Sequence, residues 1–131
     1  MKKLIILLIL ILGISLVAYA GATKYTLMEH NGTGSETGWV IVNINPQKTI
    51  LEFQVDGLTA GEKYRAFYWD YALPYSGIIE IGELKVNKFG SGHLNVHLSE
   101  GISEPCQIGV WVSEDDISNS NVVLYVELPL P

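Results

Sequence analysis

Residues 51–55, Leu-Glu-Phe-Gln-Val, alternate apolar and polar side chains, and residues 93–98, His-Leu-Asn-Val-His-Leu, repeat this alternation. Successive side chains of a β-strand point to opposite faces, so a period of two is typical of a strand with one buried face. Strands with one buried and one solvated face are common in antiparallel sheets. These two segments therefore predict an antiparallel sheet that packs on a core.

Outside these segments, the chain continues as short runs rich in Val, Ile, Tyr, Trp and Phe, separated by turns rich in Gly, Pro, Asn and Ser. The strand-like runs are residues 24–28, 39–45, 49–55, 63–71, 78–86, 93–98, 107–112 and 122–128. No segment has apolar residues at helical spacing over three turns, which argues against the crossover helices of a parallel α/β fold. We expect an all-β fold, a two-sheet antiparallel sandwich of seven to eight strands in one domain over residues 21–131.

The first twenty residues have the pattern of an export signal. Lys2 and Lys3 precede an apolar run over residues 4–17, and residues 18–20, Ala-Tyr-Ala, supply the small residues of a cleavage site. A transmembrane helix needs about 20 apolar residues, whereas a signal needs roughly 7 to 15. We expect residues 1–20 to form a cleaved signal helix, with an uncleaved membrane anchor as the alternative. The protein is then secreted or extracytoplasmic.

Charge and cysteine content limit the classes of partner and linkage. Two of the eight Lys and Arg residues lie in residues 1–20, so six remain against 14 Asp and Glu, a formal net charge of −8. This acidic excess argues against nucleic acid and anionic membrane surfaces as partners. Cys106 is the only cysteine and cannot form an internal disulfide, and its apolar neighbours predict a buried thiol.

Residues 55–67 read Val-Asp-Gly-Leu-Thr-Ala-Gly-Glu-Lys-Tyr-Arg-Ala-Phe. This segment resembles the corner of a fibronectin type III domain, although Ala60 stands where that family usually has Pro. Residues 82–94 look like a hairpin with a Gly-rich turn, as is common in exported immunoglobulin-like sandwiches. The resemblance implies that Tyr64 is a tyrosine-corner residue whose hydroxyl bonds to backbone near Leu58. It implies a recognition or spacer module and carries over no catalytic residue.

An aromatic cluster is the best candidate for a contact surface. If Tyr64 points into the core, the two-residue period places Phe67, Trp69 and Tyr71 together on the opposite face, with Tyr75 shortly after. Aromatic rings on an outer sheet face would offer a flat platform for sugars or for a partner protein. The alternative is that a loop or the N-terminal segment covers these rings, or that a bulge breaks the parity.

Two groups of residues carry metal-binding chemistry and form the basis of an alternative function. His93 and His97 share a strand face but lie roughly 13 Å apart along it, too far for one ion without ligands from other strands. Residues 114–116, Glu-Asp-Asp, with Asn119 and Asn121, supply oxygen ligands but lack the spacing of an EF-hand. We interpret these acidic residues as a solvated turn, and we assign no metal site and no cofactor.

No sequence motif for catalysis is present. Nucleophile elbow, His-Glu-x-x-His and phosphate-loop patterns are absent from the sequence. The carboxylates of Asp70 and Glu80 could serve glycoside hydrolysis, but short loops leave little room for a cleft. Asn31 begins an Asn-Gly-Thr sequon and is the candidate glycosylation site.

We therefore expect a non-enzymatic binding, adhesion or structural module at the cell surface, with a small metal- or calcium-binding envelope protein as the alternative. The expected partner is a cell-surface protein or polysaccharide. A second copy of the chain, paired along an exposed strand edge, is a further candidate partner.

Overall fold

The structure is a computed structural model that describes residues 22–45, 48–99, 101–112, 117–118 and 120–129. The predicted signal or anchor helix of residues 1–20 lies outside the described residues. Within the described part of the chain, no helix is long and apolar enough to cross a membrane.

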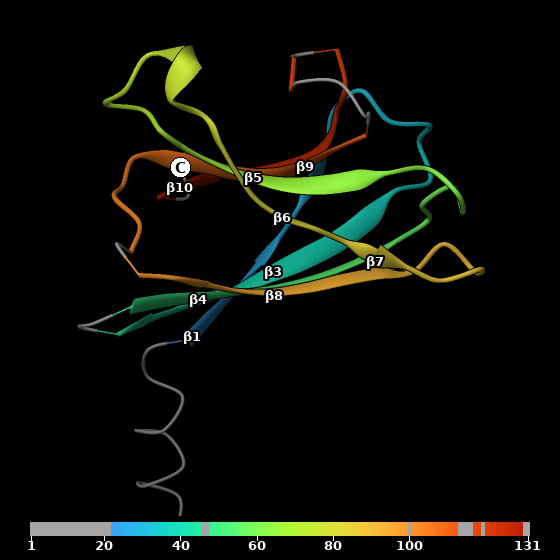
Figure 1. Cartoon of the computed structure of the whole chain (residues 1–131), viewed down its shortest axis with the longest axis horizontal. Helices are drawn as coiled ribbons and strands as arrows, with labels where there is room; N and C mark the ends of the chain where they lie inside the picture. Colours follow the sequence, from blue (N-terminus) through green and yellow to red (C-terminus); the bar gives the residue numbers. More distant parts are fainter. Residues whose placement is uncertain (1–21, 46–47, 100, 113–116, 119, 130–131) are drawn as a thin grey trace, which may run out of the picture.

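The chain folds into two antiparallel sheets that pack face to face, each with five strands in the described residues (Figure 1). Sheet A has the order β1 (Ala22–Thr26), β3 (Thr37–Asn45), β4 (Lys48–Asp56), β8 (Gly92–Leu98) and β7 (Lys85–Val86). Sheet B has the order β2 (Met28–Glu29), β10 (Val122–Leu128), β9 (Cys106–Val112), β5 (Tyr64–Asp70) and β6 (Ile79–Glu83). A short 3₁₀ turn, η1 (Tyr75–Gly77), joins β5 to β6. The predicted all-β, two-sheet sandwich is confirmed.

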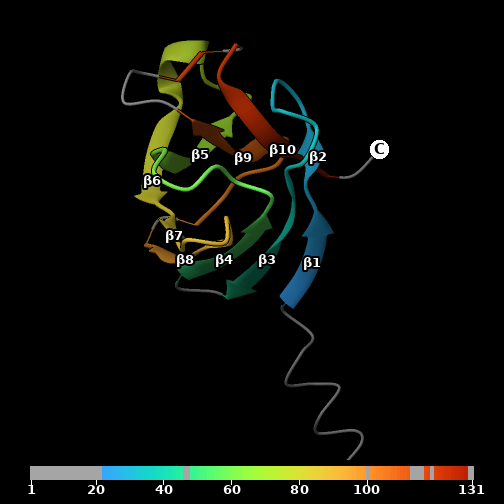
Figure 2. The ribbon, with the colours of Figure 1, turned by 90° about the vertical axis from the view of Figure 1, so that its right-hand side faces the viewer.

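Two of the predicted strands cross from one sheet to the other at a buried leucine. The run 24–28 splits at Leu27 into β1 and β2, and the run 78–86 splits at Leu84 into β6 and β7. The backbone N–H of each leucine donates to a carbonyl oxygen 2.9 Å away, so the crossing leaves neither donor unsatisfied. Figure 2 shows that β1 and β2 lie along one side of the sandwich and β6 and β7 along the other. In the described residues, the eight predicted runs therefore become ten strands.

The core lies between the sheets and follows from the alternation that predicted them. In β4, Leu51, Phe53 and Val55 are fully buried, whereas Glu52 faces solvent. Inward-facing side chains of β9 and β10 meet them from sheet B. Cys106 at the start of β9 is a free, fully buried thiol of this core, as its apolar neighbours predicted.

The corner before β5 is held by the hydroxyl group of Tyr64. The backbone N–H of Thr59 donates to Tyr64 Oη at 2.9 Å, and Tyr64 itself is buried. The predicted bond from this hydroxyl to backbone near Leu58 is therefore confirmed. Gly57 turns the chain with a φ of +74°, and a Cβ there would collide with the backbone of Ser35. Together these contacts fix the direction in which β5 enters sheet B.

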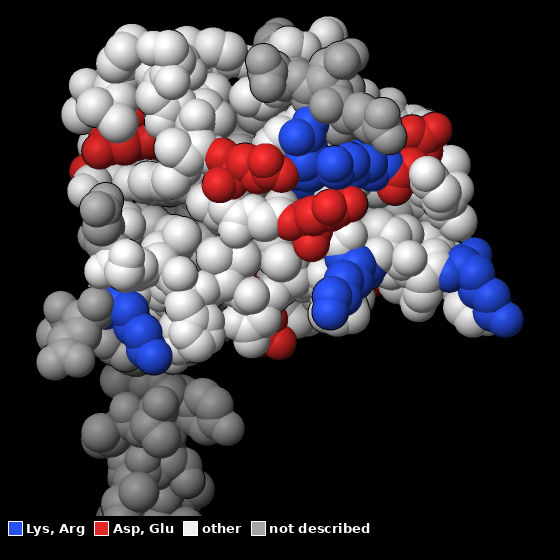
Figure 3. All heavy atoms as spheres, in the orientation of Figure 1, with Lys and Arg blue, Asp and Glu red and all other residues white. Residues whose placement is uncertain are grey.

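Charged side chains are mixed on the side of the molecule that Figure 3 shows. Lys and Arg side chains lie next to Asp and Glu side chains there, and no large patch of one sign forms.

Candidate functional site

The alternation of side chains along β5 determines which of them lie on the outer face of sheet B. Tyr64 and Ala66 point into the core between the sheets, so Arg65, Phe67 and Trp69 point outward, as the two-residue period predicted. Arg65 lies opposite Trp111 of β9, and its guanidinium carbon is 4.5 Å from the centre of that ring. Sheet B therefore carries aromatic side chains on both of its faces.

Phe67 does not contribute to an exposed contact surface, which corrects the prediction for this residue. Its side chain is 0% exposed and packs with Trp111 and Val122 in a second apolar cluster on the outer face. The cause is Gly109, which lies opposite Phe67 on β9 and has no side chain. A Cβ on Gly109 would lie 2.7 Å from Phe67 Cε1, so the ring fills the space that the glycine leaves. Ile78 packs against the same cluster and helps to cover it.

The other three predicted rings lie together. The ring centre of Trp69 is 4.7 Å from that of Tyr71 and 5.5 Å from that of Tyr75, both in edge-to-face geometry. Trp69 and Tyr71 are half-buried, and Tyr75 is 49% exposed. Edge-to-face pairs contribute about 0.5–1.5 kcal/mol each beyond burial, so the rings support one another in a fixed arrangement. We call Trp69, Tyr71 and Tyr75 the aromatic triplet.

Local turn chemistry explains how Tyr75 reaches Trp69. Asp70 ends β5, where its side-chain Oδ1 accepts from the N–H of Ala72 at 2.9 Å and its carbonyl accepts from the N–H of Leu73 at 2.9 Å. Pro74 then starts η1 with a φ of −64°, as proline favours. Trp69 Nε1–H donates to the carbonyl oxygen of Leu73 at 3.3 Å. The chain thus folds back over β5 and places Tyr75 beside Trp69.

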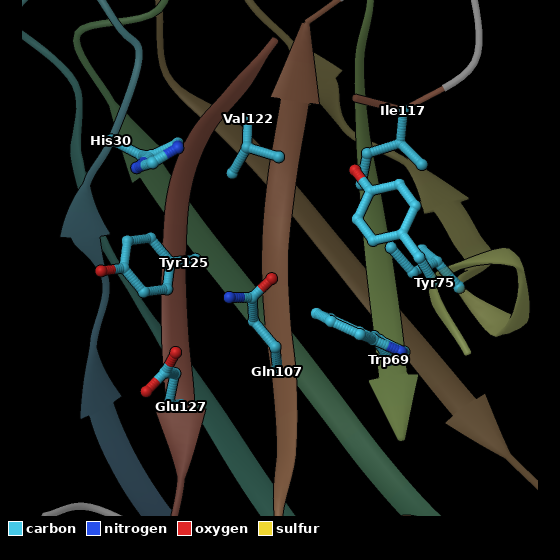
Figure 4. Close-up of a pocket in the computed structure, with 9 residues that line it drawn as sticks. His30, Trp69, Tyr75, Gln107, Ile117, Val122, Tyr125 and Glu127 are labelled. Atoms are coloured by element: carbon cyan, nitrogen blue, oxygen red, sulfur yellow. The ribbon is translucent and has the colours of Figure 1, made fainter. Parts of the chain in front are cut away.

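A groove of about 250 Å³ opens beside the aromatic triplet on the outer face of sheet B. Figure 4 shows Trp69 and Tyr75 on one side of it and His30 and Tyr125 on the other, with Gln107 between them. The ring centres of His30 and Tyr125 are 5.6 Å apart, again edge to face. The described lining residues are His30, Trp69, Tyr75, Ile78, Gln107, Ile117, Val122, Tyr125 and Glu127.

The polar residues of the groove escaped prediction because they come from other strands. Gln107 on β9 pairs with Trp69 on one side and with Glu127 of β10 on the other, which places all three in one row across the sheet. The sequence predicts strands at 107–112 and 122–128 from their content of β-branched and aromatic residues. Such a run predicts a strand but does not specify its neighbour across the sheet.

Tyr71 connects β5 to β10 through a charged acceptor. Its hydroxyl donates to Glu127 Oε1 at 2.9 Å, and its backbone N–H donates to the carbonyl of Pro105 at 3.1 Å. Burial raises the pKa of Tyr71, and the nearby carboxylate of Glu127 raises this pKa further because it disfavours a phenolate. The hydroxyl therefore stays protonated at physiological pH and acts as a donor.

A second hollow, of about 290 Å³, adjoins the groove. Tyr75, Ile78 and Ile117 line both hollows and form a ridge between them. In the second hollow, the Arg65 guanidinium lies 3.7 Å from a carboxylate oxygen of Glu80 and stacks on Trp111. Glu80 is thus paired with Arg65, whereas Asp70 serves the turn after β5, so the two predicted carboxylates have separate partners.

The predicted metal ligands are not gathered into a site among the described residues. His93 and His97 are both exposed on the outer face of sheet A, where His93 lies opposite Gln54 and His97 opposite Ile50. No group of three or more His, Cys, Asp or Glu side chains that could hold a metal ion occurs in the described part of the chain. Residues 114–116 and Asn119 lie outside the described residues.

The sequon of Asn31 lies in an exposed loop whose conformation is fixed by Glu36. The backbone N–H of Thr33 donates to both carboxylate oxygens of Glu36, at 2.9 and 2.8 Å, and Gly34 N–H donates at 3.2 Å. Burial raises the pKa of Glu36, but these hydrogen bonds to the charged form outweigh it, and the net pKa is lowered. Glu36 therefore acts as a structural anion that orders the loop.

In comparisons with known proteins, no family model and no curated protein sequence matches the chain.

Proposed function

We propose that this protein is an exported, non-enzymatic binding module of the cell surface, and that it binds its partner at the groove on the outer face of sheet B. The observation that carries the proposal is the aromatic triplet beside the groove. Trp69 is held edge to face by two tyrosines, next to Gln107 and Glu127. Aromatic anchors beside a few well-placed polar groups are the usual composition of a recognition site.

The position of the groove supports binding by a preformed surface. Trp69, Gln107 and Glu127 lie on three neighbouring strands, and the buried Phe67 packs between β5 and β9. Side chains on strands that pack against a core lose little freedom when a partner binds, so binding costs little conformational entropy. The export pattern of residues 1–20 supports a location outside the cytoplasm.

We also propose that the sandwich is of the fibronectin type III or immunoglobulin-like kind. The support is the corner at residues 55–67, where Tyr64 accepts a hydrogen bond from Thr59 as a tyrosine corner does. This proposal concerns architecture and assigns no activity, since such sandwiches carry many functions.

Capture of native cell-envelope material by the immobilised protein tests the proposed function. Wild type is compared with Trp69→Ala and with a control, Trp39→Ala, matched for stability by thermal melting. Trp39 is also half-buried on an outer sheet face, but on sheet A, where its ring lies 4.7 Å from Lys24 Nζ. We expect about a tenfold loss of capture for Trp69→Ala alone, the effect of removing a central aromatic anchor. Equal capture by the two variants would contradict the proposed site.

A further inference from the structure

The side chains around the groove favour a ligand with apolar faces and hydroxyl-bearing edges. Trp69, Tyr75 and Tyr125 present aromatic surface, and Gln107 offers both a donor and an acceptor. Glu127 accepts from Tyr71 through one oxygen, whereas a carboxylate can accept about four hydrogen bonds. A pyranose ring has this combined chemistry, because its C–H face stacks on aromatic rings and its hydroxyl groups both donate and accept.

The charge of the groove limits that ligand further. The described residues that line it include Glu127 but no Lys or Arg. In the second hollow the positive charge of Arg65 lies against Glu80 and over Trp111. With a net charge of −8 outside residues 1–20, the protein repels uronic acids, sulfated sugars and phosphates. A neutral ligand meets no such barrier.

The two hollows together indicate a chain of sugar units rather than a single one. The groove, at about 250 Å³, is smaller than the roughly 300–1,000 Å³ of sites for drug-sized ligands. The second hollow continues from it across the ridge of Tyr75, Ile78 and Ile117. A polymer can place consecutive units in the two hollows while its backbone crosses the ridge.

We propose that the outer face of sheet B binds a neutral polysaccharide, with one sugar ring in the groove against Trp69 and Tyr75 and the next units over the ridge in the second hollow. This inference rests on the proposed binding function and names its ligand class. Gln107 and Glu127 bind the ring hydroxyls in the groove, and the aromatic rings provide most of the contact area.

A competition assay tests the ligand class. The immobilised protein captures native envelope material, and envelope extracts treated in two ways compete for binding. Mild periodate cleaves the vicinal diols of sugars and leaves most protein intact, whereas proteinase K leaves glycans intact as free chains or glycopeptides. We expect the protease-treated extract to compete as well as the untreated one and the periodate-treated extract to compete at least tenfold less.

Two variants connect that result to the groove. We expect Tyr75→Ala and Gln107→Ala each to reduce capture by about tenfold. Tyr75 is half-exposed and lies outside the strands, so its removal leaves the fold intact. Phe89→Ala is the control, because Phe89 is 80% exposed in the turn between β7 and β8 of sheet A and lines neither hollow. It should retain full capture.

The possible results separate this inference from the proposed function. If protease treatment abolishes competition and periodate treatment does not, the ligand is a protein; the inference is then wrong while the binding function stands. If wild type captures nothing, both are wrong. If capture is lost equally in Tyr75→Ala and Phe89→Ala, the ligand does not bind at the groove.

Discussion

Substitution of Gly109 by alanine tests the packing that buries Phe67 on the outer face of sheet B. A Cβ at this position would meet the carbonyl oxygen of Leu124 and would lie 2.7 and 2.8 Å from two ring carbons of Phe67. The ring could shift, but the carbonyl oxygen belongs to β10, which is fixed by its pairing with β9. Overpacking of a core usually costs about 1–3 kcal/mol, and a backbone contact places Gly109→Ala in the upper part of that range, about 2–3 kcal/mol.

Thermal unfolding of the purified protein, followed by circular dichroism, measures this cost. At roughly 4 °C per kcal/mol for a domain of this length, we expect Gly109→Ala to lower the Tm by about 8–12 °C. Phe67→Leu removes the ring carbons that the new methyl group would meet. In the wild type, Phe67→Leu should lower the free energy of unfolding through lost contacts. In the Gly109→Ala background the same substitution should lower it less, and the difference between the two values is a coupling energy of about 0.5–3 kcal/mol.

Two results would refute this reasoning. A Tm for Gly109→Ala within about 1 °C of wild type would show that the site has room for a side chain. Simple additivity of the Gly109→Ala and Phe67→Leu costs would show that Phe67 does not occupy the space above Gly109. In either case packing against Gly109 would not explain the burial of Phe67.

Three further predictions concern the loop, the corner and the core. Glu36→Gln should lower the free energy of unfolding by about 1–3 kcal/mol at pH 7, because it weakens charge-assisted hydrogen bonds from Thr33. Because the pKa of Glu36 is lowered in the folded state, the stabilisation from its carboxylate is complete above pH 4.5 and is lost as the pH falls below the folded-state pKa. Urea titrations at pH 2 should therefore give Glu36→Gln and wild type the same free energy of unfolding, and a remaining difference would contradict this. Tyr64→Phe should cost about 1–3 kcal/mol in the same titrations, because the N–H of Thr59 loses its acceptor, and an unchanged midpoint would show that water replaces the hydroxyl. Burial raises the pKa of the Cys106 thiol to about 12, so iodoacetamide at pH 8 should modify it only in urea, and rapid modification of the folded protein would show that β9 opens.

Alternation predicts the strands and buried faces at residues 51–55 and 93–98, and runs rich in β-branched and aromatic residues predict the other strands. The run 122–128 coincides with β10, and the parity argument from Tyr64 placed Trp69 on the outer face. The runs that contain Leu27 and Leu84 were predicted as single strands because each stays apolar through the crossing. The sequence around a buried leucine looks the same whether the leucine lies within one strand or at the point where the chain crosses between two sheets. Only the pairing partners of the flanking residues reveal the change of sheet.

Part of the candidate site follows from residues that are close in the sequence, and part depends on the order of strands that are distant in the sequence. Trp69, Tyr71 and Tyr75 are close in sequence, so the short turn after Asp70 was enough to bring them together. Gln107 and Glu127 join them only through the order of β5, β9 and β10, which the sequence alone does not specify. The burial of Phe67 depended on one residue of a distant strand, the glycine at position 109. Predicting it would have required the register of β5 against β9.

The two outer faces of the sandwich differ in a way that bears on function. An antiparallel sandwich needs one apolar face per sheet, and the face of sheet A away from the core carries Glu52, Asn95 and His97. The corresponding face of sheet B has a second apolar cluster of Phe67, Trp111 and Val122. This cluster is not needed to join the two sheets, but it packs directly beside the groove. Ile78, Ile117 and Tyr125 pack against this cluster and also line the groove. Side chains held by an apolar cluster keep fewer rotamers before a ligand arrives, which lowers the entropy cost of binding. The proposed binding function therefore predicts that disruption of the cluster weakens binding even where the core between the sheets stays intact.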